Sequence, residues 1–183
     1  MTKTKKLTLS AMLTALAFVL MLVSKQIPAP WLQGGSITIC SMVPIVMVSV
    51  LAGTKWGLAS GISFSLIQMM TGFYAPPVPN LLSFVAVIML DYILAFGVLG
   101  LAGFFVKLMG KKAWAIPVSG AIVTALRFVM HILSGVLIWS YYAGETNALI
   151  YSLTYNGSYM IPEIIITTVT LALIAPKLKN KIA

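Results

Sequence analysis

The sequence predicts an all-α integral membrane protein with six transmembrane helices and both termini in the cytoplasm. Three observations support this prediction: the chain is mostly apolar, its apolar stretches have the length of membrane spans, and its lysines gather in alternate connections. Of the 183 residues, 60% are hydrophobic and 8% are charged, and the mean hydropathy is +1.03. Because a soluble domain has about 25% charged residues, we expect a single membrane domain over residues 1–183.

Six apolar runs, separated by Pro, Gly and Lys, approach the ~20 residues that cross about 30 Å of hydrocarbon. The second and third runs are short, and the connection Gly53-Thr54-Lys55-Trp56 between them is tight, which leaves their division open. The first run follows three lysines, as in a signal peptide, but its full span length and the missing cleavage site favour an uncleaved helix. The predicted spans are residues 7–24, 37–52, 57–73, 81–106, 114–139 and 153–176.

The basic residues predict the orientation, because cytoplasmic loops carry the excess of Lys and Arg in membrane proteins. With six spans and cytoplasmic termini, only Lys25 falls on the outer side, whereas an odd number of spans would export the C-terminal lysines. The outer connections are then residues 26–36, 74–80 and 140–152. The lysines expected on the cytoplasmic side are Lys3, Lys5, Lys6, Lys55, Lys107, Lys111, Lys112, Lys177, Lys179 and Lys181.

The sequence lacks the common signatures of enzymes and metal sites. It has no G-x-x-x-x-G-K-[ST] motif for ATP hydrolysis, no nucleophile elbow and no Gly-rich dinucleotide turn. The single cysteine, Cys40, can form no internal disulfide, and no His, Cys or carboxylate spacing fits a structural metal. The net charge of +9 comes from lysines between apolar runs, which argues against nucleic-acid binding. We therefore expect no catalytic activity, no cofactor and no metal.

Four ionisable residues interrupt the apolar runs, namely Asp91, Arg127, His131 and Glu163. Each costs several kcal/mol in hydrocarbon unless it is paired or faces a polar cavity. At ~1.5 Å per residue from the outer span ends, Asp91, His131 and Glu163 lie on the order of 12–15 Å deep on three different helices. Arg127 precedes His131 by one turn on the same helix face. These positions predict an outward-opening pocket between the helices.

Aromatic and amide side chains share the faces of these ionisable residues. A pocket with aromatic walls and a few placed polar groups is typical of small-molecule sites. The residues that join the pocket on this ground are Tyr92, Gly135, Trp139, Tyr155, Asn156 and Tyr159.

The charges in this pocket indicate a missing cation. If Asp91 and Glu163 are ionised and Arg127 pairs with one of them, one buried negative charge has no fixed partner. A cationic ligand would satisfy that charge, and rings such as Trp139 would add a cation–π attraction of roughly 0.5–2 kcal/mol. A protonated His131 or a neutral carboxylic acid would satisfy it equally well. The residues alone leave these three possibilities open.

Several local stretches resemble one family of membrane proteins. They are Gln33-Gly34-Gly35-Ser36, Asp91-Tyr92, the stretch from Arg127 through His131, Ser134 and Gly135 to Trp139, and Tyr151 through Tyr155-Asn156-Gly157-Ser158-Tyr159. With them the chain resembles the substrate-binding S components of energy-coupling factor (ECF) vitamin transporters, within these the thiamine-specific group called ThiT or YuaJ. The resemblance implies a subunit of a prokaryotic plasma membrane that binds thiamine and works with a T component and two ATPase subunits.

The resemblance also implies roles for single residues. Trp139 and His131 would flank the thiazolium ring, and Asp91 would meet its positive charge. The family has glutamate at this position, so the reach is about 1.5 Å shorter here and the contact would become looser or water-mediated. Other implied contacts are hydrogen bonds from Tyr92, Tyr151 and Asn156, cover of the aminopyrimidine by Trp31, and docking of the T component on Ala11 and Ala15. We expect Arg127 and Glu163 to form a deeper supporting pair, with Gly135 and Tyr159 beside it.

Three other functions stay open from the sequence. A stand-alone secondary transporter of a cationic solute would use Asp91, Glu163 and His131 as a proton relay. An intramembrane enzyme or assembly factor would use Asp91 and His131 as acid and base. An S component for another vitamin, such as riboflavin or biotin, would share the fold but not the need for a buried negative charge.

Overall fold

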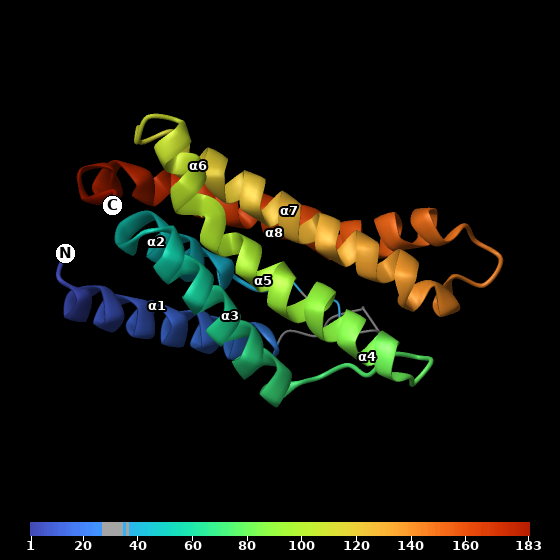
Figure 1. The fold of residues 1–183 in the computed structure, drawn as a ribbon. Helices are drawn as coiled ribbons and strands as arrows, with labels where there is room; N and C mark the ends of the chain where they lie inside the picture. The colour runs from blue at the N-terminus through green and yellow to red at the C-terminus, as the bar shows by residue number, and fades with distance from the viewer. Residues whose placement is uncertain (27–34, 36) are drawn as a thin grey trace.

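The computed structural model describes residues 1–26, 35 and 37–183, which form a bundle of helices (Figure 1). In this part of the chain there are six helical runs, the fourth of which combines several helix types. The runs are α1 (Lys3–Ser24), α2 (Met42–Ala52), α3 (Thr54–Thr71), the continuous run of α4 (Leu81–Val87), η1 (Ile88–Leu94), α5 (Ala95–Gly97), η2 (Val98–Leu101) and α6 (Ala102–Leu108), then α7 (Ala115–Leu137) and α8 (Ala148–Leu178). The short 3-10 helices η3 (Trp139–Ala143) and η4 (Lys179–Lys181) follow α7 and α8.

Four helices in the described part are long and apolar enough to cross a membrane, which confirms the all-α membrane class. They are Lys3–Ser24, Leu81–Leu108, Ala115–Leu137 and Ala148–Lys181. The other two runs are shorter. α2 has 11 residues, which at ~1.5 Å per residue extend about 16 Å, and α3 has 18 residues.

α2 begins later than the predicted span of residues 37–52. Its first helical residue is Met42. Two features of the preceding segment keep it out of the helix. Cys40 has a φ of 61°, which is uncommon for a residue other than glycine and incompatible with a right-handed helix. The backbone N–H of Thr38 donates to the Glu163 carboxylate of α8 instead of to a helical carbonyl. The sequence shows only an apolar run here, so these features could not be read from it.

The predicted tight connection between the second and third spans is a single residue, Gly53. Its φ of 107° lies in a region that glycine adopts without strain. The Gly53 N–H ends α2 by donating to Ser49 O at 3.1 Å, and Gly53 O accepts from Trp56 and Gly57 to begin α3. The two short helices therefore form a close hairpin.

α8 begins earlier than the predicted residue 153. Asn147 caps it, because its Oδ1 accepts from the backbone N–H groups of Leu149 at 2.9 Å and Ile150 at 3.4 Å. Asparagine is a favoured N-cap residue. The connection before α8 is therefore shorter than the predicted 140–152, and Tyr151 lies in the first turns of the helix.

The run from Leu81 to Leu108 is not α-helical throughout. Ile88–Leu94 forms a π-helix and Val98–Leu101 a 3-10 helix. π-helical segments are rare and occur frequently at functional sites. Asp91 lies in the middle of this segment, which the apolar sequence pattern gave no reason to expect.

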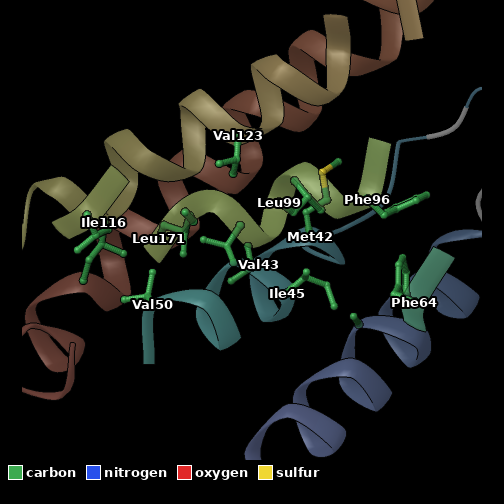
Figure 2. Close-up of a cluster of buried hydrophobic side chains, with 14 of the residues drawn as sticks. Met42, Val43, Ile45, Val50, Phe64, Phe96, Leu99, Ile116, Val123 and Leu171 are labelled. Atoms are coloured by element: carbon green, nitrogen blue, oxygen red, sulfur yellow. The ribbon is translucent and has the colours of Figure 1, made fainter. Parts of the chain in front are cut away.

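The apolar core surrounds α2 (Figure 2). Every residue of α2 except Met47 is buried, so the helix is apolar on all sides and has no periodicity. Side chains from five other helices meet it. Those labelled in Figure 2 are Met42, Val43, Ile45 and Val50 of α2, Phe64 of α3, Phe96 and Leu99 of the fourth run, Ile116 and Val123 of α7, and Leu171 of α8.

α3 approaches the fourth run so closely that backbones touch. A Cβ on Gly61 would lie 2.4 Å from Phe96 O, and a Cβ on Gly100 would lie 2.3 Å from Leu58 N. Ser49 of α2 joins this contact, because its hydroxyl donates to Gly100 O and accepts from Gly103 N. Small residues allow such approaches between membrane helices.

Both chain ends lie at one end of the bundle, with the connections between α2 and α3 and between α6 and α7 (Figure 1). We call this the termini end. The connections between α3 and α4 and between α7 and α8 lie at the opposite end, which we call the loop end.

Candidate ligand-binding site

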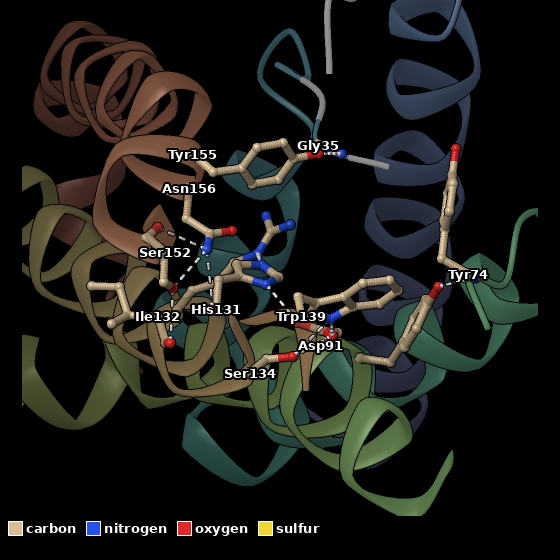
Figure 3. Close-up of polar contacts among 12 residues, drawn as sticks. Gly35, Tyr74, Asp91, His131, Ile132, Ser134, Trp139, Ser152, Tyr155 and Asn156 are labelled. Carbon is tan, nitrogen blue, oxygen red and sulfur yellow. Dashed lines mark hydrogen bonds and ion pairs between the residues drawn. The ribbon is translucent and has the colours of Figure 1, made fainter. Parts of the chain in front are cut away.

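Asp91 lies among hydrogen-bond donors from α7 and η3, and we call Asp91, His131, Ser134 and Trp139 the Asp91 cluster (Figure 3). Asp91 Oδ1 lies 3.1 Å from His131 Nδ1, and Oδ2 accepts from Ser134 Oγ at 2.6 Å and Trp139 Nε1 at 3.0 Å. An ionised carboxylate is purely an acceptor, so three donors suit it. The Asp91 side chain is 17% exposed. Part of its surface therefore stays reachable for a ligand.

The helical spacing of α7 brings its polar residues to one face. Arg127 and His131 are four residues apart and His131 and Ser134 three, so they are neighbours on the helix. All three are buried. Trp139 follows in η3, and its Nε1 also lies 3.1 Å from Ser134 Oγ. Ser134 therefore connects the indole to the carboxylate.

Arg127 makes no ion pair of the expected kind. Among the described residues, no carboxylate lies within ion-pair distance of Arg127 or of a lysine, and the Asp91 carboxylate instead contacts the imidazole of His131. Arg127 Nε instead donates to His131 Nε2 at 3.3 Å, and Nη1 contacts Met42 Sδ at 3.0 Å. Its guanidinium carbon lies 4.2 Å from the centroid of the Phe96 ring. The expectation that Arg127 pairs directly with a carboxylate is therefore wrong, because its side chain is directed to the imidazole.

Glu163 joins α8 to the segment before α2. Its Oε1 accepts from the backbone N–H of Thr38 and from Thr38 Oγ1 at 2.6 Å. Thr38 Oγ1 in turn accepts from Ser41 Oγ at 2.5 Å. Glu163 is 1% exposed, and its Oε2 has no hydrogen-bond partner among the described residues. Glu163 thus supports the fold through Thr38 and not through an ion pair with Arg127.

Asn156 holds α8 against α7. Its Nδ2 lies 3.2 Å from His131 O, 3.0 Å from Ser152 O and 3.2 Å from Ser152 Oγ. Its Oδ1 accepts from the Tyr159 hydroxyl. The helices touch here, because a Cβ on Gly135 would lie 2.1 Å from Ser152 Oγ. The amide of Asn156 is therefore engaged within the protein, next to the Asp91 cluster.

Tyr92 bonds through its hydroxyl to the connection between α3 and α4. Its hydroxyl donates to Gly72 O at 3.2 Å and accepts from Tyr74 N at 3.0 Å. Its ring stacks on Phe73 with centroids 5.6 Å apart. The ring packs in a small apolar cluster that includes Trp139. Tyr92 therefore fixes the connection between α3 and α4 beside the Asp91 cluster.

A groove of about 580 Å³ lies between α3 and the start of the fourth run. Its lining offers no charged group, so it does not suit a charged ligand. The lining residues are Leu66, Met69, Met70, Phe73, Phe84 and Ile88.

Comparison with known proteins identifies the family. Residues 7–183 match the family described as thiamine transporter protein (Thia_YuaJ). The chain belongs to this family. The thiamine transporter ThiT of Bacillus subtilis (strain 168) is 35% identical over 184 residues, which cover 92% of this chain and 90% of the relative. The predicted resemblance to the Thia_YuaJ family is thereby confirmed, and the chain is a multi-pass membrane transporter and not an enzyme.

A solved structure has the same fold. ThiT from Listeria monocytogenes superposes with a TM-score of 0.74, at 22% identity, over 97% of this chain and 98% of that chain. The six helical runs described above therefore have the arrangement of a solved ThiT structure.

The structure brings together only some of the residues that the Thia_YuaJ resemblance assigned to the ligand. Asp91, His131 and Trp139 lie in one cluster. Tyr151 is half-buried in α8 and stacks on Tyr155 with centroids 5.9 Å apart. The Tyr155 hydroxyl accepts from the Gly35 N–H at 3.2 Å (Figure 3). The predicted contact residue Trp31 lies outside the described residues.

Three residues of the site had no role in the sequence-based prediction. Ser134 accepts from Trp139 and donates to Asp91, and its position one turn after His131 was the available signal. Thr38 and Ser152 gave no signal, because each depends on a contact with a residue more than 15 positions away. The Thr38 contact joins residues 125 positions apart, and Ser152 donates to the carbonyl of Ile132 at 2.9 Å.

Proposed function

We propose that this chain is the thiamine-binding S component of an ECF vitamin transporter and captures thiamine from the outer side of the membrane. The observation that carries this proposal is the Asp91 cluster. A partly exposed carboxylate accepts there from three side-chain donors and has no lysine or arginine partner in the part of the chain that the structure describes. Thiamine carries a permanent positive charge on its thiazolium ring, and such a charge would satisfy Asp91.

Family and geometry support the same roles for two further residues. His131 and Trp139 both bond to Asp91, so a thiazolium near this carboxylate would lie against their rings. The Trp139 N–H is occupied by Asp91 and one face of the indole stacks on Tyr142 with centroids 6.3 Å apart, so a cation–π contact would use the other face. By resemblance to the family, hydrogen bonds to the ligand remain proposed for Tyr92, Tyr151 and Asn156, and cover of the aminopyrimidine remains proposed for Trp31. For Tyr92 and Asn156 this requires that the ligand displace or share a protein hydrogen bond.

The proposed orientation puts both termini in the cytoplasm. Two observations support it. The chain ends and the connections that carry ten of the eleven lysines gather at the termini end of the bundle, as expected for the cytoplasmic side. The Asp91 cluster lies toward the loop end, where Trp139 follows α7. A ligand would therefore enter from the outer side.

Tryptophan fluorescence tests ligand and site together. Thiamine titrated into the purified protein is expected to quench fluorescence and to saturate at about one thiamine per chain, because the ring would contact Trp139. In Trp139→Ala we expect that quenching to be lost and Kd to rise at least about 30-fold, since anchor residues contribute about 2 kcal/mol or more.

Trp114→Ala is the matched control. Trp114 is 53% exposed just before α7, at the termini end of that helix, and its removal should leave affinity and saturation unchanged. Equal quenching in wild type and Trp139→Ala would contradict the proposed site. Absence of any saturable thiamine response in the wild type would contradict the proposed function.

Transport requires partners in this proposal, namely a T component and two ATPase subunits. Ala11 and Ala15 are exposed on one face of α1, and two small residues one turn apart allow a second helix to approach closely. We expect Ala15→Trp to keep thiamine binding and to reduce uptake in cells that contain the partners by at least about tenfold, because the indole prevents that approach.

Leu16→Trp is the control for this surface, since Leu16 is exposed on the neighbouring face of α1. Uptake measured with labelled thiamine should stay near wild type in this variant. Normal uptake by Ala15→Trp would remove α1 as the docking face. Accumulation of thiamine by the purified chain alone in liposomes with a proton gradient would favour a stand-alone transporter.

A further inference from the structure

Arg127, His131 and Asp91 form a chain of hydrogen bonds that fixes the proton on the imidazole. Arg127 Nε carries a hydrogen and donates to His131 Nε2 at 3.3 Å. His131 Nε2 must therefore be the acceptor, so the imidazole proton resides on Nδ1, 3.1 Å from Asp91 Oδ1. The guanidinium is held in place by Met42 Sδ of α2 and by the Phe96 ring of α5.

This arrangement disfavours protonation of His131 to the imidazolium form. An imidazolium has N–H donors on both nitrogens, so its Nε2–H would face the Nε–H of Arg127. Two positive charges would then be in contact at a site that is buried from solvent. Besides Asp91 of η1, the described ionisable groups near Arg127 and His131 are Tyr159 and Glu163 of α8. The ring of Tyr159 lies 6.1 Å from that of His131, and Glu163 is bonded to Thr38.

We propose that Arg127 is a positioning residue that holds His131 as the neutral Nδ1–H tautomer, so that no imidazolium competes with a cationic ligand for Asp91. The inference rests on the proposed thiamine site and adds a property to it. Histidine ordinarily changes charge between pH 5 and 8. With the tautomer held, the preference of the site for a cation does not depend on pH in this range.

Nitrogen NMR reads the tautomer directly, because His131 is the single histidine of the chain. In protein labelled with ¹⁵N-histidine and placed in nanodiscs without thiamine, we expect the neutral Nδ1–H tautomer. The spectrum should stay the same as the pH falls from 8 to 5.5, the range in which a free histidine titrates. An imidazolium or an Nε2–H tautomer within this range would overturn the proposal.

Variants of Arg127 test its part in this state. In Arg127→Leu we expect Nε2 to lose its donor and His131 to take up a second proton as the pH falls. Arg127→Met keeps more of the side-chain length and serves the same purpose if the leucine variant does not fold. Arg127→Lys retains a cationic donor and should restore the wild-type spectrum. A wild-type spectrum in the leucine or methionine variant would show that Arg127 does not hold the tautomer.

Thiamine titrations separate this inference from the proposed function. The wild-type Kd is expected to change less than about twofold between pH 8 and 6, whereas that of Arg127→Met should rise about fourfold, as for a proton competing at the ordinary histidine pKa of about 6.5. A wild-type protein with the neutral tautomer but no thiamine binding would refute the proposed ligand only. A wild-type Kd that rises fourfold over this range would refute the role of Arg127 only.

Discussion

Replacing Asp91 by asparagine is expected to weaken thiamine binding by about 2–5 kcal/mol, on the order of 30-fold to several thousand-fold in Kd. The substitution removes the negative charge and keeps the shape of the side chain. Asparagine still offers an oxygen to Ser134 and Trp139, which now bond to Asp91 Oδ2, whereas its NH2 group replaces the oxygen that faces His131 Nδ1. Because two of the three bonds of the cluster remain, the larger part of the loss should come from the ligand charge. Isothermal titration calorimetry measures it, and thermal unfolding should show little change.

Glu145→Gln is the matched control for this change. Glu145 is exposed in the connection before α8, so the variant loses the same charge near the same end of the bundle. We expect its Kd to stay near wild type. An equal loss in both variants would indicate a general electrostatic effect at the loop end. Full binding by Asp91→Asn would mean that the ligand does not need this charge, as for a neutral vitamin.

Replacing Gly100 by alanine is expected to destabilise the protein strongly or to prevent folding. Ordinary overpacking of a core costs about 1–3 kcal/mol, and we expect a larger loss here. The new Cβ would lie 2.3 Å from Leu58 N and 2.5 Å from Gly57 C. These are backbone atoms of α3, which cannot rotate away as a side chain can. Separation of α3 from η2 would also stretch the Ser49 contact to Gly100. Size-exclusion profiles and thermal unfolding in detergent measure the effect.

Gly97→Ala in the same run provides the comparison. A Cβ on Gly97 would have Ile62 Cγ1 as its nearest neighbour, at 3.9 Å, which is ordinary contact. Because alanine favours a helix over glycine by about 1 kcal/mol, we expect equal or slightly higher stability. Equal unfolding temperatures for Gly97→Ala and Gly100→Ala would show that α3 does not pack closely against Gly100.

The sequence predicted well those features that depend on hydropathy and helical spacing alone. Six apolar runs indicated the all-α membrane class, because hydrocarbon allows few ways to satisfy a backbone. The cost of charge in hydrocarbon singled out Asp91 and His131, which the structure joins by a contact of 3.1 Å between Asp91 Oδ1 and His131 Nδ1. The four-residue spacing of Arg127 and His131 placed them on one face, as their hydrogen bond confirms.

Features that depend on tertiary contacts could not be predicted from the sequence. A rule of charge balance assigned Arg127 to a carboxylate, but Met42 and Phe96 direct its side chain to the imidazole. The start of α2 depends on Thr38, whose N–H is bonded to Glu163 125 residues away. Such pairings leave no local pattern, because neither residue constrains the sequence around its partner.

The π-helical segment η1 lets the two halves of the fourth run differ in their rotation about the helix axis. The half toward the termini end is fixed by Gly100 and Gly103 against α2 and α3, where a change of orientation would cost close packing. A π-helix accommodates one residue more per widened turn than an α-helix, and one residue corresponds to about 100° of rotation. Asp91 lies within this segment and can therefore face α7 at an angle that the glycine contacts do not dictate. The orientation of residue 91 and the packing at residue 100 can thus vary independently within one continuous helix.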